Sequence, residues 1–250
     1  MAAQSSNLNE ELGQVEYIFS DKTGTLTCNI MEFKKFSTGY HSYSYDSKHN
    51  YVNQNQGEYE HVLGSGNDSI DQVLSNRNHS QHHAVSEVLQ HLAICHTVIK
   101  DLRKGCFSAS SPDELALVDG AKALGFEFID RDPDNIITIR LNFSDEELRF
   151  KLLNILEFNS TRKRMSVIVQ NLQTDEILLL TKGADSIVRD LLDDHINQKI
   201  LEQAQNHVES YAETGLRTLL LAKKTLSVQA YEAWNEMYAE ANLSIANRED

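Results

Sequence analysis

The heptapeptide Asp21–Thr27 (Asp-Lys-Thr-Gly-Thr-Leu-Thr) places an acidic, a basic and three hydroxyl side chains around one glycine. It follows Gln14–Ser20, whose β-rich composition predicts a strand, so Asp21 would stand at the carboxyl end of that strand. A carboxylate placed there can project into a crevice and attack phosphorus, with a metal ion offsetting the charge repulsion. The alternative is a turn in which Asp21 caps local backbone N–H groups. The complete motif favours the nucleophile.

Three further segments carry groups suited to a ligand with an aromatic base and phosphates. Glu157–Val167 predicts two strands joined by a basic turn, where Phe158 could stack on a base; the alternative is a hairpin with Phe158 in the core. Lys182 follows a predicted strand and could neutralise phosphate, and Gly183 would let a ligand approach closely; the alternative is a simple turn from strand to helix. Arg217 could fork onto phosphate or ribose oxygens, although a solvated arginine beside a helix-stopping glycine is commoner.

A compact helix start, Ser-Pro-Asp-Glu, begins at Ser111 and predicts a helix that runs to Leu124 and stops at Gly125. Ser111 can cap this helix, and Pro112 suits its first position. Glu114 falls where the carboxylate of a capping box sits, but the same carboxylate could instead face a ligand. The two roles compete, and we favour the ligand.

The rest of the pattern predicts an α+β fold, an antiparallel sheet flanked by helices, because strand-like segments are joined by short polar connectors. Ser37–Ser80 is rich in Ser, Asn, Gln, Gly, Tyr and His and predicts mostly a long loop. The expected strands are Ile30–Phe36, Phe126–Ile129, Ile136–Leu141, Phe150–Phe158, Met165–Gln170, Ile177–Thr181 and Thr218–Lys224, with a short one in Gly105–Ala109. Besides the helix after Ser111, the expected helices are His83–Lys100, Ala184–Leu192, Ile196–Glu213 and Val228–Ala241.

Composition narrows the class of protein. The 250 residues carry 23 Lys+Arg against 37 Asp+Glu, a formal charge of −14, which argues against a nucleic-acid partner. No apolar run approaches the ~20 residues needed to span a bilayer, and three cysteines without a paired framework favour a reducing, cytosolic setting. We therefore expect this chain to be soluble and cytoplasmic. A group of histidines could hold a metal: His79, His82, His83, His91 and His96. No cysteine or carboxylate partner has the spacing of a structural zinc site, and polar positions on a helix are favoured for His91 and His96.

Asp21–Thr27 resembles the phosphorylation signature of the P-type ATPases, a branch of the haloacid-dehalogenase-like superfamily. The resemblance implies that Asp21 becomes the aspartyl phosphate, that Lys22 contacts the γ-phosphate of ATP, and that Asp21 and the Thr23 carbonyl hold Mg²⁺. Thr23 stands where related phosphatases carry a second aspartate as general acid and base. Hydrolysis of the acyl phosphate then lacks a local proton shuttle, and a longer-lived phosphoenzyme is expected.

The other segments resemble the nucleotide-binding (N) domain of the same ATPases. By that resemblance Glu114 belongs to the adenine pocket, Phe158 stacks on adenine, Lys182 lies in the nucleotide pocket and Arg217 lies on the phosphate side. Asn7–Tyr17 and the runs Phe-Asn-Ser-Thr-Arg-Lys-Arg-Met-Ser, Lys-Gly-Ala-Asp and Gly-Leu-Arg-Thr-Leu are most similar to the phospholipid-transporting flippases, the type IV branch. Cation pumps match less well.

The resemblance implies a domain layout. Residues 1–35 would begin the phosphorylation (P) domain with its isolated first strand and loop, and 36–245 would form the N domain, with a mobile loop over about 37–80. Residues 246–250 would begin the return to the P domain. The sequence lacks the family's transmembrane helices, its Asp-Gly-Glu-Thr actuator motif and its Gly-Asp-Gly-x-Asn segment, so we expect a fragment of a longer pump.

The expected function is that of the ATP-binding cytosolic portion of a phospholipid-translocating pump at the cytosolic face of a membrane. This chain alone would bind ATP without transporting lipid, and would meet phospholipid, membrane and any accessory subunit only through the rest of the protein. Two alternatives remain open. One is a non-enzymatic interaction or regulatory fragment that docks through Ser37–Ser80, and the weaker one is a free-standing phosphatase.

Overall fold

The computed structural model describes residues 13–46, 49–53, 70–100, 107–109 and 111–243. The chain divides into two units, residues 1–31 and 32–250, and each is described by itself. The predicted return segment 246–250 and much of the predicted loop, residues 47–48 and 54–69, lie outside the described residues.

In the first unit, residues 15–20 are extended but form no strand, so the strand predicted over Gln14–Ser20 is not confirmed. The side chains of Tyr17, Ile18 and Phe19 are 76%, 86% and 96% exposed. A strand is stable only when neighbouring strands pair with its backbone and cover its apolar face, and the described part of this unit supplies neither. A local loop follows, in which the N–H groups of Leu26 and Thr27 donate to the Lys22 carbonyl at 3.0 and 3.1 Å.

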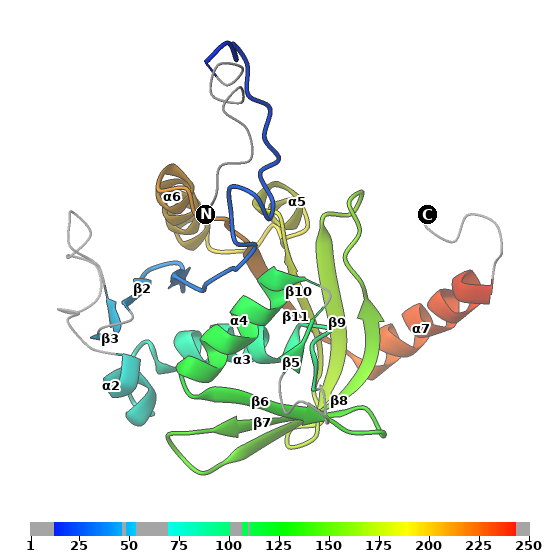
Figure 1. The fold of residues 1–250 in the computed structure, drawn as a ribbon. Helices are drawn as coiled ribbons and strands as arrows, with labels where there is room; N and C mark the ends of the chain where they lie inside the picture. Colours follow the sequence, from blue (N-terminus) through cyan, green and yellow to red (C-terminus); the bar gives the residue numbers. More distant parts are fainter. Residues whose placement is uncertain (1–12, 47–48, 54–69, 101–106, 110, 244–250) are drawn as a thin grey trace. The chain divides into compact units, whose positions relative to one another are not determined.

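The second unit is built on a six-stranded antiparallel sheet in the order β11-β10-β9-β8-β7-β6 (Figure 1). Each strand from β7 to β11 pairs with the strand before it in the chain. The short polar connectors predicted this antiparallel pairing for β6 to β10, whereas β11 returns to β10 after a longer helical connection. Alternate residues of these strands face the core because side chains of a strand point to opposite faces in turn. The strands are β6 (Phe126–Arg131), β7 (Ile136–Leu141), β8 (Glu147–Leu156), β9 (Arg164–Asn171), β10 (Ile177–Gly183) and β11 (Leu220–Leu226).

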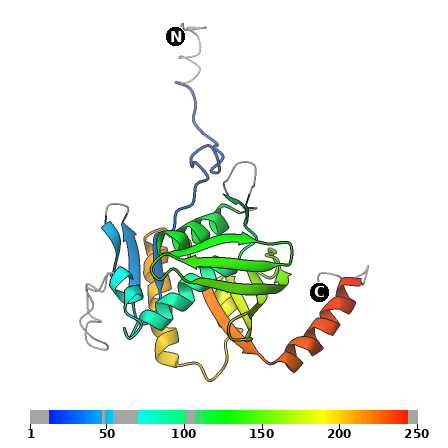
Figure 2. The same cartoon turned by 90° about the horizontal axis from the view of Figure 1, so that it is seen from below.

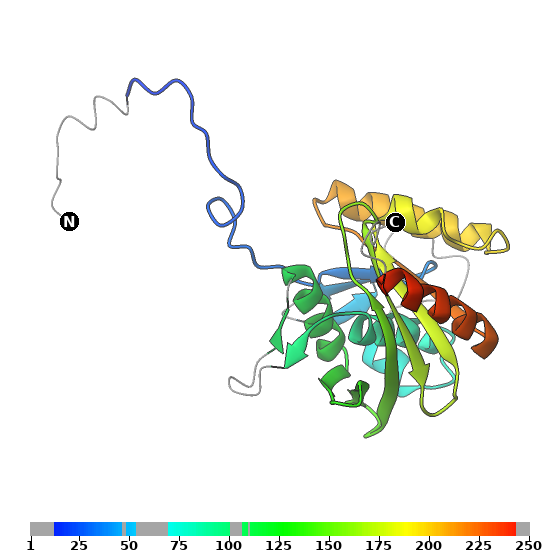
Figure 3. The same ribbon diagram turned by 90° about the vertical axis from the view of Figure 1, so that its right-hand side faces the viewer.

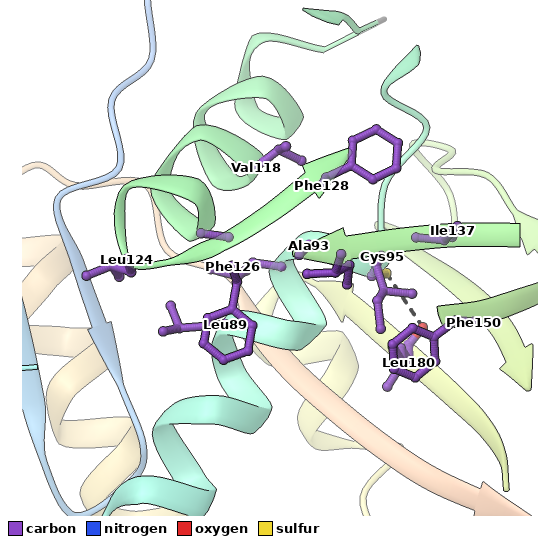
Figure 4. Packing of buried hydrophobic residues seen from close by; sticks show 14 of the residues in the cluster. Leu89, Ala93, Cys95, Val118, Leu124, Phe126, Phe128, Ile137, Phe150 and Leu180 are labelled. Atoms are coloured by element: carbon purple, nitrogen blue, oxygen red, sulfur yellow. Dashed lines mark hydrogen bonds between the residues drawn. The ribbon is translucent and has the colours of Figure 1, made fainter. Parts of the chain in front are cut away.

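Two helices, α3 (His82–Ile94) and α4 (Pro112–Ala123), pack against each other and against β6. Their apolar side chains meet those of the strands in one buried cluster, part of which is drawn in Figure 4. Leu89, Ala93 and Val118 come from the helices, and each is at most 1% exposed. Burying such a side chain contributes about 1.5–3 kcal/mol for the larger ones, so this cluster dominates the stability of the unit.

The ends of these helices follow from specific residues. Ser111 Oγ accepts a hydrogen bond from the Asp113 N–H at 3.2 Å, and Gly125 ends α4 with a φ of +90°, as predicted. The helix predicted over His83–Lys100 is shorter than expected, because α3 stops at Ile94. Just after this helix end, the ring of His96 forms hydrogen bonds with two backbone groups. Its Nε2 lies 2.9 Å from the Ala93 carbonyl, and its Nδ1 accepts from the Val98 N–H at 3.1 Å.

The prediction of a loop over Ser37–Ser80 is wrong for several stretches. The chain forms a three-stranded antiparallel sheet, β1 (Lys35–Ser37), β2 (Ser42–Asp46) and β3 (His49–Asn53), and then helix α2 (Ile70–Ser75). The sheet is anchored by Tyr43, which is 1% exposed and stacks on Phe36 with ring centroids 4.8 Å apart. Alternation of tyrosine with serine was the period-two signal of this strand. Of the strand predicted over Ile30–Phe36, only the last two residues belong to β1.

The remaining elements surround the six-stranded sheet. A short pair, β4 (Ile99–Lys100) and β5 (Phe107–Ser108), precedes α4, and α5 (Asp185–Arg189) follows β10. Helix α6 (Gln198–Glu213) lies against β1, where Tyr211 donates a hydrogen bond to the Phe36 carbonyl at 3.2 Å (Figures 2 and 3). Helix α7 (Val228–Leu243) follows β11 and is tied to β8 by Asn154, which accepts a hydrogen bond from the Tyr231 hydroxyl at 2.9 Å and donates one to Asn235 Oδ1 at 3.1 Å. None of its described side chains is buried. No helix in the described ranges is both long and apolar enough to cross a bilayer.

Candidate functional site

Four strand ends meet at one end of the six-stranded sheet. Because the sheet is antiparallel, β8 ends where β9 begins, and β10 ends where β11 begins, all on the same side. Phe158 lies in the turn from β8 to β9, Lys182 is the penultimate residue of β10, and Arg217 precedes β11 by three residues. The fold therefore brings three of the predicted ligand-binding side chains to one end of the sheet.

The centre of this site is a buried ion pair between Glu114 and Lys182. Lys182 Nζ lies 2.9 Å from Glu114 Oε1, and the two residues are only 6% and 8% exposed. The second carboxylate oxygen, Oε2, accepts hydrogen bonds from Thr97 Oγ1 at 2.6 Å and from the Thr97 N–H at 3.2 Å. Glu114 thus joins helix α4 to strand β10, and both of its carboxylate oxygens accept hydrogen bonds from within the protein, from Lys182 and Thr97.

Two opposing effects set the pKa of Glu114. Burial raises the pKa by penalising the charged form. The Lys182 ammonium and the hydrogen bonds from Thr97 lower it, and their combined effect is larger than that of burial. The net shift is downward, so Glu114 is ionised at neutral pH. A buried charge pair of this kind is strongly destabilised when one partner is removed, because the other is left uncompensated.

Three buried titratable groups surround this pair, and the sequence pattern did not single them out as part of the site. Burial lowers the pKa of His91 to about 3, assisted by the ammonium groups of Lys182 and Lys223. Burial also lowers the pKa of His96 to about 4 and raises that of Cys95 to about 12. The Cys95 thiol donates to the Leu180 carbonyl at 3.6 Å (Figure 4). His91 and His96 therefore belong to the core, contrary to the expectation that they are polar positions on a helix surface.

Phe158 is 63% exposed, which contradicts the alternative of a hairpin with this ring in the core. The turn that carries it is internally braced: Asn159 Oδ1 accepts from the Arg162 N–H at 2.6 Å, and the Asn159 carbonyl accepts from the Lys163 N–H at 2.8 Å. Lys163 has a φ of +49°, a left-handed conformation that reverses the chain into β9. An exposed aromatic ring on a braced turn is available to stack on a planar ligand.

Gly183 is required by the protein's own packing. A Cβ at this position would lie 2.6 Å from Arg164 Cβ and 2.7 Å from the Lys163 carbonyl oxygen, both from the neighbouring strand and turn. The Ala184 N–H also donates to that carbonyl at 3.0 Å. The absence of a side chain at Gly183 therefore allows the turn that carries Phe158 to pack closely against the end of β10, and the close approach of a ligand to Gly183 stays a prediction.

Arg217 is not a free solvated side chain. Its Nη1 lies 2.5 Å from Asp113 Oδ2, and the two side chains are 58% and 29% exposed. Asp113 immediately precedes Glu114 at the start of α4. Nothing in the sequence pattern pointed to Asp113 or Thr97, because both act through residues that are distant in the chain.

Asp21, Lys22 and Thr23 lie in the first unit, so their position relative to the ion pair is not defined. All three residues are exposed. The Asp21 carboxylate and the Thr23 carbonyl are oxygen donors of the kind that Mg²⁺ prefers, and two protein ligands suffice for an ion that keeps waters and phosphates in its shell. Among the described residues, no group of three His, Cys, Asp or Glu could hold a metal, so the alternative of a histidine metal site gains no support.

Comparison with known proteins identifies the family of this chain. Residues 84–248 match the family model described as P-type ATPase, cytoplasmic domain N. The chain is 44% identical over 248 residues to the phospholipid-transporting ATPase DRS2 of Saccharomyces cerevisiae, covering 98% of this chain and 18% of that protein. It is 39% identical over 249 residues to the phospholipid-transporting ATPase tat-1 of Caenorhabditis elegans (98% and 20%), and 42% identical over 260 residues to the human phospholipid-transporting ATPase ID (99% and 21%).

This chain thus spans about a fifth of the length of the curated relatives it matches. The family model alone covers more than half of the chain, and the fold is the antiparallel sheet with helices expected from the motifs. The chain therefore belongs to the P-type ATPases, as a fragment similar to their phospholipid-transporting members that contains the cytoplasmic domain N.

Proposed function

We propose that this chain is the ATP-binding cytoplasmic portion of a phospholipid-translocating P-type ATPase. Residues 36–245 serve as the N domain and residues 1–35 begin the P domain. The observation that carries the proposal is the convergence of an exposed aromatic ring, a buried Glu–Lys pair and an exposed arginine at one end of the sheet. Its cofactors are ATP and Mg²⁺.

Each side chain has a role suited to its surroundings. The Phe158 ring stacks on adenine, because it is exposed and its turn is held in place. Glu114 and Lys182 form the floor of the adenine pocket, where the Glu114 carboxylate holds Lys182 and Thr97 in place beneath the base. Arg217 lies on the phosphate side, where a guanidinium can fork onto phosphate oxygens.

We further propose that Asp21 is the residue phosphorylated in the complete pump, with Lys22 on the γ-phosphate. Mg²⁺, held by the Asp21 carboxylate and the Thr23 carbonyl, supplies charge neutralisation when bound. The Asp21 carboxylate oxygen forms the new bond to phosphorus, and ADP leaves with the electrons of the bond that breaks. Thr23 has no carboxylate to move a proton to or from water, so the acyl phosphate persists. Lipid movement and any accessory subunit belong to the remainder of the pump.

The test of the nucleotide site is a calorimetric titration of the 250-residue chain with MgATP. Phe158→Ala should weaken binding by about 5-fold to 100-fold, the loss of one base–aromatic stack, whereas Phe158→Trp should retain most of the affinity. Leu172→Ala is the matched control, because Leu172 is a partly exposed apolar residue in the β9–β10 turn at the opposite end of the sheet.

Equal MgATP affinities for the wild type and Phe158→Ala would reject the adenine role of Phe158 and, with it, the proposed pocket. The role of Asp21 needs the full-length protein. Label transferred from [γ-³²P]ATP should be released by hydroxylamine, as an acyl phosphate is, and should be absent in Asp21→Asn. Hydroxylamine-resistant label, or label that persists in the variant, would exclude Asp21 as the phosphorylated residue.

A further inference from the structure

Two adjacent carboxylates at the start of α4 hold Lys182 and Arg217, two cations of the proposed nucleotide site. Glu114 pairs with Lys182 at 2.9 Å and Asp113 pairs with Arg217 at 2.5 Å. The pairs differ in burial: the side chains of Lys182 and Glu114 are 7% and 10% exposed, whereas that of Arg217 is 58% exposed. The inner pair is part of the core, and the outer pair can open without disturbing it.

The carboxylate of Asp113 depends on Arg217 for its compensation. Its Oδ2 accepts from Arg217, while its Oδ1 is buried and has no hydrogen-bond partner in the described parts of the chain. Most exposed ion pairs cost little to open, because water replaces the partner. Here Oδ1 is already cut off from water, so release of Arg217 leaves Oδ2 as the one oxygen of this carboxylate that water can reach. The free energy of holding Arg217 therefore lies toward the upper end of the range for surface ion pairs.

Arg217 is also the mobile cation of the site. Its guanidinium ends a long flexible side chain, is always charged, and matches the geometry of phosphate oxygens. Asp113 presents the same kind of forked oxygen acceptor that a phosphate group does. A phosphate that takes up Arg217 must therefore displace Asp113 or lie beside its negative charge.

We propose that Asp113 is an intramolecular competitor for Arg217 that sets how strongly this site responds to the phosphates of its ligand. This inference rests on the proposed function and adds a residue and a specificity to it. Asp113 weakens the binding of ligands that carry phosphates and does not affect the binding of the nucleoside. The domain then gains less affinity from each phosphate than its cations alone would give, which favours release of the nucleotide.

The experiment compares the wild-type chain with Asp113→Asn by NMR titration with MgATP and with adenosine, because chemical-shift titrations measure weak affinities. Asp113→Asn should bind MgATP about threefold to fivefold more tightly, the range expected for removing one competing ion pair, and adenosine unchanged. The effect should shrink at high salt and in an Arg217→Ala background. Asp119→Asn is the matched control, because Asp119 is an exposed residue of the same helix and its change alters the net charge equally.

Unchanged or weaker MgATP binding by Asp113→Asn, or an equal gain for adenosine, overturns the inference while leaving the proposed function intact. An equal gain in Asp119→Asn also overturns it, because net charge would then explain the effect. A wild-type chain that binds neither ligand overturns the proposed function and the inference together. Thermal melts of each variant separate a loss of folding from a change in affinity.

Discussion

Replacement of His91 should reduce the acid sensitivity of this chain by a predictable amount. His91 lies in α3 at 5% exposure, with its Nε2 buried and lacking a hydrogen-bond partner in the described residues. Burial, assisted by the nearby ammonium groups of Lys182 and Lys223, lowers the pKa of His91 to about 3. The folded protein therefore keeps this ring neutral at a pH where the unfolded chain protonates it.

The sign and size of the effect follow from this difference in proton binding. In the unfolded chain a histidine has a pKa of about 6.5, so below that pH the unfolded state binds a proton that the native state refuses. The stability contributed by a neutral His91 is complete above pH 6.5 and is lost as the pH falls toward 3. Between pH 7 and pH 5 the free energy of unfolding should drop by roughly 2 kcal/mol on account of His91 alone.

The assay is urea unfolding followed by circular dichroism at pH 7, 6 and 5, with the free energy of unfolding extrapolated to water. His91→Leu should lose roughly 2 kcal/mol less than the wild type across this range. His83→Gln serves as the control, because His83 lies on the same helix with its side chain 84% exposed, and its pH dependence should match the wild type. If His91→Leu and the wild type lost the same stability between pH 7 and pH 5, the ring would not be held neutral in the core.

Three other substitutions test the site's framework. Lys182→Met should lower the free energy of unfolding by about 3–5 kcal/mol because it leaves the Glu114 carboxylate buried alone, and adding Glu114→Gln should recover part of that loss in urea unfolding. Gly183→Ala should destabilise the domain by about 1–3 kcal/mol, since its methyl group would lie 2.6 Å from Arg164 Cβ; an unchanged melting temperature would contradict that packing. Ser111→Ala should cost about 1 kcal/mol through loss of the helix cap, seen as a lower urea midpoint, whereas Ser111→Asp should stay close to wild type.

Much of the main sheet was predictable from local patterns. Ile136–Leu141 was predicted with its observed bounds, and the other strands of the sheet were found to within a few residues, because apolar alternation and short polar turns identify antiparallel strands. The small sheet β1–β3 was largely missed because serine, not an apolar residue, alternates with tyrosine in β2, and the surrounding polar stretch resembles a loop. The strand predicted over Gln14–Ser20 failed for the opposite reason: its local signal is strong, but no neighbour pairs with it in the described residues.

The individual site residues were easier to propose than their connections. Glu114, Phe158, Lys182 and Arg217 each stood out by residue type and context, but their roles in binding ATP stay predictions. The pairing of Glu114 with Lys182 joins residues 68 positions apart, and no local pattern encodes such a contact. Thr97 and Asp113 were overlooked because each acts on a partner supplied by a different element.

The sequential order of the six strands has a consequence for how this domain folds. Each hairpin from β6 to β10 closes a short loop, which costs little chain entropy and favours rapid zipping of neighbouring strands. Glu114 lies before β6 and Lys182 near the end of β10, so β6 to β9 and most of β10 lie between the two partners along the chain. The ion pair between Glu114 and Lys182 should therefore form late, after the hairpins between these two residues have formed and brought them close to each other. During refolding, the strand signal in circular dichroism should recover before the capacity to bind nucleotide.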